Sequence, residues 1–137
     1  MKERFQGIES SILEAIQADL ARAPKVEHCG LLLARPGSSL VESRVAYPGP
    51  LRSREFALPE EWLLQAFLQQ RGLGFEVAGF YHTHPVGEGL APSPLDRAGH
   101  PPGSLVLLVG PSRWQAYRIG EKRWQSLALE LRSSPTG

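Results

Sequence analysis

The hydrophobic positions along the chain predict two long helices and several strands. Between residues 7 and 22, apolar side chains recur every three or four positions, as on one face of a helix: Ile8, Ile12, Ala15, Ile16 and Leu20. Pro24 ends this helix because it has no N–H to continue the hydrogen-bond ladder. A second helix is predicted to begin at Leu58–Glu61, where a proline and two acidic residues suit a first turn, and to end at Gly72 or Gly74.

Runs of apolar and β-branched residues predict the strands. They cover Glu27 to Ala34, Leu40 to Tyr47, residues 75 to 83, Leu105 to Val109, Trp114 to Ile119 and Arg123 to Leu129. A short helix is expected after Asp96, because the stretch from Gly99 to Gly103 cannot continue one. We therefore predict an α/β fold, a single mixed sheet flanked by helices. It forms one domain over residues 1–137, with 132–137 as a frayed tail.

Composition and charge exclude several classes of protein. The chain has 137 residues, 42% of them hydrophobic and 21% charged, which is typical of a globular domain. The net charge of +1 and the scattered arginines argue against a nucleic-acid partner. One cysteine excludes an internal disulfide and fits a reducing compartment. The first residues lack the apolar core of a signal peptide, and no run reaches membrane-spanning length, so we expect a cytoplasmic protein without a membrane partner.

Two histidines mark the end of the predicted strand 75–83. Side chains alternate along a strand, so His82 and His84 leave one face and Thr83 leaves the other. Pro85 then ends the strand, since it cannot donate to a ladder. Asp96 follows after a glycine-bearing loop and supplies a third ligand. Three such ligands with a fourth position left for water are typical of a catalytic zinc site.

Each of these residues also has a structural interpretation. Alone, a His-x-His pair is a weak sign of a metal. The stretch from Ser93 to Asp96 is also an ordinary helix start, which is compatible with ligation because a helix N-terminus favours an ionised carboxylate. Cys29 is interpreted as a small buried hydrophobe rather than a nucleophile. His28 is interpreted as structural or solvated, and His100 as a loop histidine, with a role behind the ligands left open.

The motifs together resemble the signature of the JAMM (MPN+) metalloprotease family. That signature contains His-Ser/Thr-His-Pro, a short loop and Ser-x-x-Asp, and the chain has His82-Thr83-His84-Pro85 and Ser93-Pro94-Leu95-Asp96. The family's upstream Glu-x-Cys-Gly is matched by Glu27-His28-Cys29-Gly30. Taken alone, Glu27 would be interpreted as a solvated residue at a strand end. Its place in the motif indicates a functional role instead. The loop between His84 and Ser93 is one residue longer than is common in the family.

The resemblance implies both a site and a substrate. One Zn²⁺ per chain would be held by His82, His84 and Asp96, with Glu27 as the proton shuttle and Ser93 as the oxyanion donor. The family cleaves peptide or isopeptide bonds at the C-termini of ubiquitin-like proteins. The chain has no room for large substrate-grasping insertions, so a compact, prokaryotic-type member acting on a ubiquitin-like sulfur-carrier protein is expected. A homodimer is left open.

Two alternatives to this function remain from the sequence. The chain could be a noncatalytic MPN-type scaffold that binds protein partners, although the complete set of motif residues argues against that. It could also be a zinc peptidase of another substrate, such as cell-wall peptide. A zinc nucleoside deaminase is disfavoured, because that chemistry expects His-x-Glu followed by Cys-x-x-Cys and the chain has one cysteine.

Overall fold

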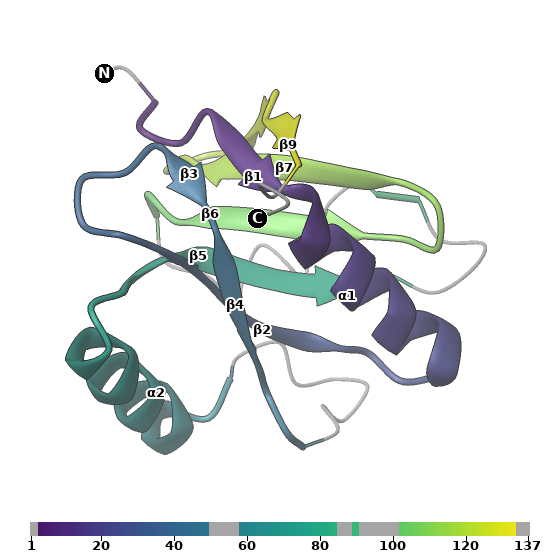
Figure 1. The fold of residues 1–137 in the computed structure, drawn as a ribbon. Coiled ribbons are helices and arrows are strands. Elements are labelled where there is room, and N and C mark those ends of the chain that lie inside the picture. Colours follow the sequence, from purple (N-terminus) through teal and green to yellow (C-terminus); the bar gives the residue numbers. More distant parts are fainter. Residues whose placement is uncertain (1–2, 50–57, 85–88, 91–101, 134–137) are drawn as a thin grey trace.

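A computed structural model of the chain describes residues 3–49, 58–84, 89–90 and 102–133. Figure 1 shows a twisted sheet with helices packed against it. The elements are, in order, β1 (Gly7–Glu9), α1 (Ser10–Arg22), β2 (Cys29–Ala34), β3 (Leu40–Val41), β4 (Ser43–Ala46), α2 (Glu60–Gly72), β5 (Glu76–Thr83), β6 (Leu105–Val109), β7 (Trp114–Ile119), β8 (Trp124–Leu127) and β9 (Glu130–Arg132). This is the α/β fold that the sequence predicts.

The strands form one large and one small sheet. The large sheet has the order β4-β2-β5-β6-β7-β8, in which only the β5–β6 pair is parallel. The small sheet has the order β3-β1-β9, and both of its pairs are parallel. The central strand β5 therefore has β2 on one side and β6 on the other, and it carries the His-x-His pair at its C-terminal end.

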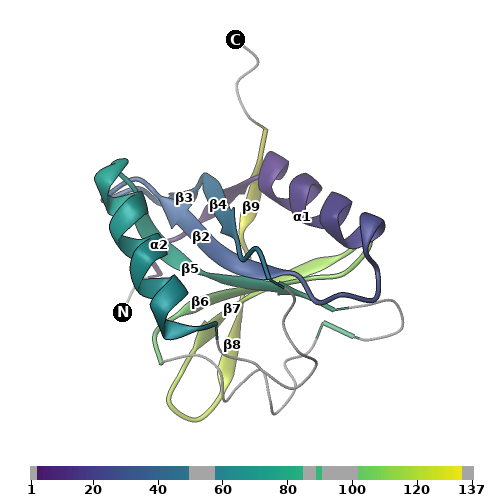
Figure 2. The same ribbon diagram turned by 90° about the horizontal axis from the view of Figure 1, so that it is seen from below.

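The two helices cover opposite faces of the large sheet. Helix α1 buries four residues, Ile12, Leu13, Ile16 and Leu20. The first three belong to the main core, with residues of β2, β5 and β6 such as Leu32, Tyr81 and Leu107. Helix α2 packs through Ala66, Trp62 and Leu63 against the other face, where Leu31 and Leu33 of β2 point. Figure 2 shows the two helices on either side of the strands.

Several predicted boundaries are wrong, and pairing partners explain why. The first helix begins at Ser10 and not at residue 7, because Gly7–Glu9 pairs with β3 and β9 as strand β1. The predicted strand from Leu40 to Tyr47 is divided into β3, which pairs with β1, and β4, which pairs with β2. Backbone pairing to distant strands cannot be read from local periodicity.

The other differences are smaller. Strand β2 begins at Cys29, two residues later than predicted, and helix α2 begins at Glu60 with Pro59 at its N-cap. The last predicted strand ends at Leu127, and β9 extends to Arg132, the first residue of the predicted frayed tail. The short helix predicted after Asp96 lies outside the described residues. The two hairpin strands around residues 120–122 are confirmed.

Candidate functional site

The register between β2 and β5 brings the upstream motif beside the histidines. The antiparallel pair places Cys29 opposite His82, and the pairing continues beyond β2, since the Thr83 amide donates to the His28 carbonyl at 2.9 Å. Residues opposite one another in an antiparallel pair share a face of the sheet. Cys29 and His82 therefore share the face that α2 covers, with Glu27 two residues before Cys29 along the chain.

The two imidazoles are buried and close together. His82 is 8% exposed and His84 is 6% exposed, and their ring centres lie 5.3 Å apart. Two imidazoles that bind one tetrahedral zinc ion at about 2.0–2.1 Å have ring centres about 5 Å apart. The spacing of the pair therefore fits two ligands of a single ion.

The tautomer of His84 is set by a backbone carbonyl. Its Nδ1 lies 2.8 Å from the carbonyl oxygen of Gly89. A carbonyl can only accept, so Nδ1 must carry a proton, and in the neutral ring the lone pair is then on Nε2. This is the arrangement that orients a ligating histidine in known metal sites. The donor chemistry of His84 therefore fits a metal ligand that binds through Nε2.

The remaining predicted site residues fall outside the described part of the chain. Asp96 and Ser93 are among them, and so is His100. Within residues 3–49, 58–84, 89–90 and 102–133, no three His, Cys, Asp or Glu side chains form a group that could hold a metal ion. The spacing of the two histidines fits zinc. The complete ligand set, which includes Asp96, remains a prediction.

Cys29 is a buried thiol, as the sequence interpretation expected. It is 6% exposed. Burial, together with the negative charge of Glu27, raises the pKa of Cys29 to about 12. The thiol is therefore protonated at neutral pH and is not an activated nucleophile.

Gly30 is required by the packing on the opposite face of the sheet. A Cβ atom at this position would lie 2.1 Å from the Val45 carbonyl oxygen and 2.8 Å from Cε1 of Tyr81. The Tyr81 hydroxyl accepts a hydrogen bond from Arg44 at 3.0 Å, and Arg44 pairs with Asp19 of α1 at 2.8 Å. The Tyr81 side chain, on the face of β5 opposite to His82, is thus held between β2, β4 and α1. Sequence reasoning missed this network, although the glycine of Glu-x-Cys-Gly was a signal for it.

A second pair of hydrogen bonds ties the segment after the histidines to the sheet. The Gly89 carbonyl accepts from His84, and the Leu90 carbonyl accepts from the Tyr117 hydroxyl of β7 at 2.7 Å. A hollow of about 530 Å³ lies next to this segment. It is lined by Leu90, Ser112, Arg113, Trp114, Gln115 and Tyr117. The candidate site therefore has an open surface beside it.

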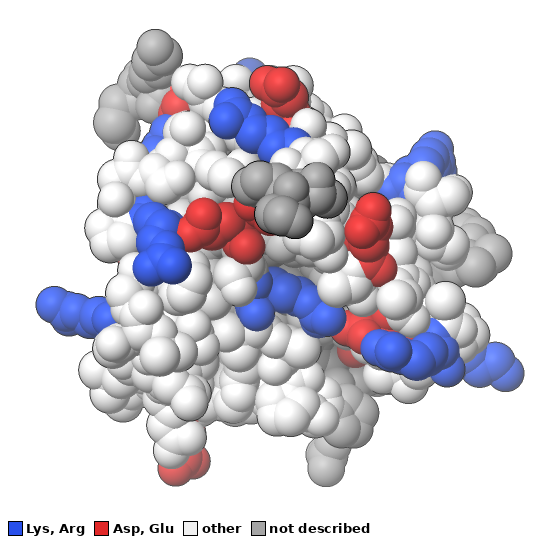
Figure 3. Space-filling view, viewed as in Figure 1, with Lys and Arg blue, Asp and Glu red and all other residues white. Residues whose placement is uncertain are grey.

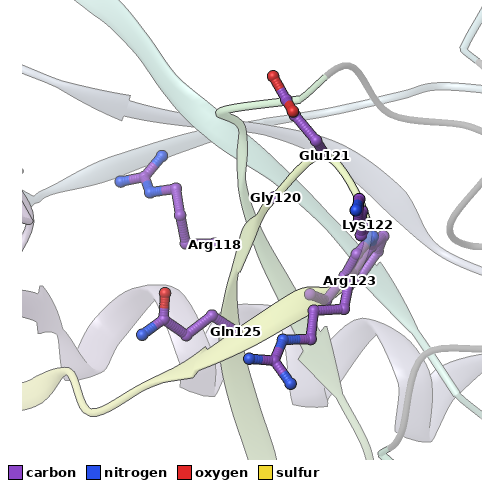
Figure 4. A pocket seen from close by; sticks show the side chains of 7 residues that line it. Arg118, Gly120, Glu121, Lys122, Arg123 and Gln125 are labelled. Atoms are coloured by element: carbon purple, nitrogen blue, oxygen red, sulfur yellow. The ribbon is translucent and has the colours of Figure 1, made fainter.

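Other surface features lie away from the histidines. The β7–β8 hairpin forms a hollow of about 510 Å³ lined by polar and charged residues such as Arg118, Lys122 and Arg123, shown in Figure 4. None of the predicted site residues lines it. On the face seen in Figure 3, basic and acidic side chains are interspersed. No described helix is long and apolar enough to cross a membrane.

Comparisons with known proteins agree with the motifs and with the fold. The family described as prokaryotic homologs of the JAB domain matches residues 9–126. No curated protein matches the sequence. Solved structures with the same fold include a protein of Desulfitobacterium hafniense, with a TM-score of 0.77 and 21% identity over 95% of this chain and 94% of that one.

Two further structures extend this likeness. A protein of Salinibacter ruber has a TM-score of 0.69 and 22% identity, covering 96% of this chain and 94% of that one. A JAB1/MPN domain protein of Archaeoglobus fulgidus has a TM-score of 0.62 and 18% identity, covering 92% of this chain and 98% of that one. The resemblance drawn from the sequence motifs is confirmed: the chain belongs to the family of prokaryotic homologs of the JAB domain.

Proposed function

We propose that this chain is a zinc-dependent metallopeptidase. It hydrolyses a peptide or isopeptide bond at the C-terminal tail of a ubiquitin-like or sulfur-carrier protein. The observation that supports the proposal is the β2–β5 register, which pairs Cys29 with His82 and so brings the Glu-x-Cys-Gly motif beside the strand that leads to two buried histidines. A carboxylate beside a pair of imidazoles is the arrangement that metal-assisted hydrolysis requires.

Each residue has a separate task in this mechanism. His82, His84 and Asp96 would hold the zinc ion, which when bound would supply a Lewis acid and lower the pKa of water enough for attack at neutral pH. Glu27 accepts a proton from the attacking water. It then delivers that proton to the nitrogen that leaves when the C–N bond breaks. The Ser93 hydroxyl donates a hydrogen bond to the oxyanion that forms from the scissile carbonyl. Removal of such a donor typically costs about 10²–10³-fold in rate.

The substrate class is supported by the family and by the shape of the sheet. Strand β4 forms the edge of the large sheet beside β2, which leads from Glu27. An extended peptide can add to such an edge through backbone hydrogen bonds. The flexible C-terminal tail of a ubiquitin-like protein is a substrate of this form.

The test compares the wild type with Glu27→Gln on a ubiquitin-like carrier bearing a short C-terminal extension. Glutamine keeps the size of glutamate but cannot take a proton at neutral pH, so turnover should fall by about 10²–10⁴-fold. Zinc content, by elemental analysis, should be unchanged, because Glu27 is assigned no bond to the metal. Full activity of Glu27→Gln would show that another group moves the proton.

The alternatives predict different outcomes of the same assay. A wild-type protein that binds the carrier but cleaves nothing, with zinc present, would be a noncatalytic scaffold. A protein that cuts the isolated tail peptide as efficiently as the intact carrier would be a general peptidase, for which cell-wall peptides are the next substrates to examine. The proposed function expects the intact carrier to be cut far faster, because its globular body orients the tail.

A further inference from the structure

Next to Glu27, one hydrogen bond between the segments of β2 and β5 is accepted by a side chain and not by a backbone carbonyl. The Thr83 amide donates to the His28 carbonyl at 2.9 Å, as in a regular antiparallel pair. In a regular pair the His28 amide would return a bond to the Thr83 carbonyl. Here the His28 amide donates to the Thr83 hydroxyl oxygen, Oγ1, at 2.9 Å. A side chain therefore takes the place of a backbone carbonyl at this position.

This hydroxyl is deeply buried. Thr83 has 0% exposure and projects from β5 on the face opposite to the two histidines. A hydroxyl in such a place needs a partner, and the His28 amide is one. Valine would fill the same volume but could accept no hydrogen bond. The hydroxyl group, and not only the shape of the side chain, is therefore what the position uses.

The residue that Thr83 holds is the one next to Glu27. Strand β2 begins at Cys29, so His28 lies just before the regular strand. Its ring Nε2 lies 3.0 Å from the carbonyl oxygen of Ala23, which anchors it from the other side. His28, which directly follows Glu27, is thus held by three contacts, made by its amide, its carbonyl and its imidazole ring. Fixing that backbone fixes the starting point of the Glu27 side chain.

We propose that Thr83 is a positioning residue for the Glu27 carboxylate. The inference rests on the proposed function, in which Glu27 moves the proton. Thr83 touches neither substrate nor metal in this role. It clamps the backbone at His28, directly after Glu27, and so restricts where the Glu27 carboxylate can lie. A small misplacement of a catalytic group can reduce a rate by about 100-fold, so such a clamp has a measurable effect.

The experiment compares Thr83→Val with Thr83→Ser in the zinc-loaded protein. Thr83→Val should lower kcat by about 10-fold to 100-fold, with KM and zinc content unchanged. Thr83→Ser keeps the hydroxyl and should retain activity within about threefold. In a Glu27→Gln background, Thr83→Val should lower kcat no further, because its effect passes through Glu27. An undiminished kcat in Thr83→Val, or an equal loss in both backgrounds, would overturn the proposal.

A measurement without catalysis separates this inference from the proposed function. Hydrogen exchange of the His28 amide, followed by NMR in the metal-free protein, should be faster in Thr83→Val than in the wild type and Thr83→Ser. If the wild type cleaves no carrier, the proposed function fails, while faster exchange still supports the clamp. Unchanged exchange in Thr83→Val would refute the clamp regardless of activity. Should Thr83→Val not fold, Thr83→Ala removes the same hydroxyl and takes its place in both measurements.

Discussion

The two faces of the large sheet are covered in different ways. On the α1 face the side chains of Leu32, Leu105 and Leu107 are fully buried, and α1 adds four buried residues. On the other face, α2 buries only Ala66 among its described residues. Among its other apolar side chains, Trp62 and Leu63 are partly buried against the sheet, whereas Leu64, Phe67 and Leu68 are 62%, 42% and 61% exposed. The same face carries the histidine pair.

The comparison indicates that the two faces have different roles, one in stability and one in the chemistry of the candidate site. The α1 face holds the main apolar core, so it should supply the larger share of the free energy of folding, because stability follows buried apolar area. The face with His82 and His84 gives up apolar burial at those positions and holds polar side chains instead. With the exception of Thr83, we expect substitutions on the first face to change stability and substitutions at the histidines on the second face to change chemistry. The predictions below test this separation.

Truncation of the α1 face should have the largest effect on folding. Leu107 is fully buried in the main core. Leu107→Ala removes buried methyl groups and leaves a cavity, so the free energy of unfolding should fall by about 2–5 kcal/mol. Urea denaturation followed by circular dichroism measures this change. A loss below about 1 kcal/mol would mean that this face is not the main source of stability.

Loss of a histidine ligand should lower the affinity for zinc and leave the fold unchanged. Changes behind a metal ligand typically cost 10–100-fold in affinity, so His84→Ala, which removes a ligand itself, should weaken zinc binding by more than about 100-fold. Competition with a chromophoric chelator measures the affinity. The metal-free wild type should keep its circular dichroism spectrum, because the main core does not include the histidines. Equal zinc affinity in both proteins would exclude His84 as a ligand.

The buried thiol makes stability fall at high pH. The pKa of Cys29 is raised to about 12 in the folded protein by burial and by Glu27. The unfolded chain loses this proton first, so between about pH 9 and pH 12 the folded state binds more protons. The free energy of unfolding should therefore decrease by about 1.4 kcal/mol per pH unit in that window through this group.

The matched control for the thiol is Cys29→Ala, studied without metal. Other groups also titrate at high pH, so the quantity to compare is the difference between the two unfolding curves as the pH rises. The wild type should lose more stability than Cys29→Ala between pH 9 and pH 11. Parallel pH profiles would indicate that Cys29 ionises as readily in the folded protein as in the unfolded chain.

Truncation of the exposed side of α2 should have the smallest effect. Leu68 is 61% exposed, so Leu68→Ala removes little buried area and should change the free energy of unfolding by less than about 0.5 kcal/mol. It is the matched leucine-to-alanine control for Leu107→Ala, measured in the same urea experiment. A cost close to that of Leu107→Ala would show that the two faces contribute equally to stability.

The sequence by itself determined the elements with strong local signals. Helix α1 follows from the spacing of its apolar residues, and strand β6 from an unbroken apolar run. The alternation of side chains along a strand was enough to place His82 and His84 on one face. The motif spacing was enough to indicate the family, which the match over residues 9–126 confirms. These features depend on neighbours within a few positions along the chain.

Only the tertiary structure decided which distant segments meet. Strand β1 formed where a helix was predicted, because Gly7–Glu9 pairs with strands that lie far along the chain. The pairing of the Glu-x-Cys-Gly segment with β5 depends on a register between residues more than 50 positions apart. The use of the Thr83 hydroxyl in that register has no local signature either. The hydrophobic pattern limits the register of a strand once its partner is known, but which distant strand becomes the partner is decided by the packing of the whole sheet.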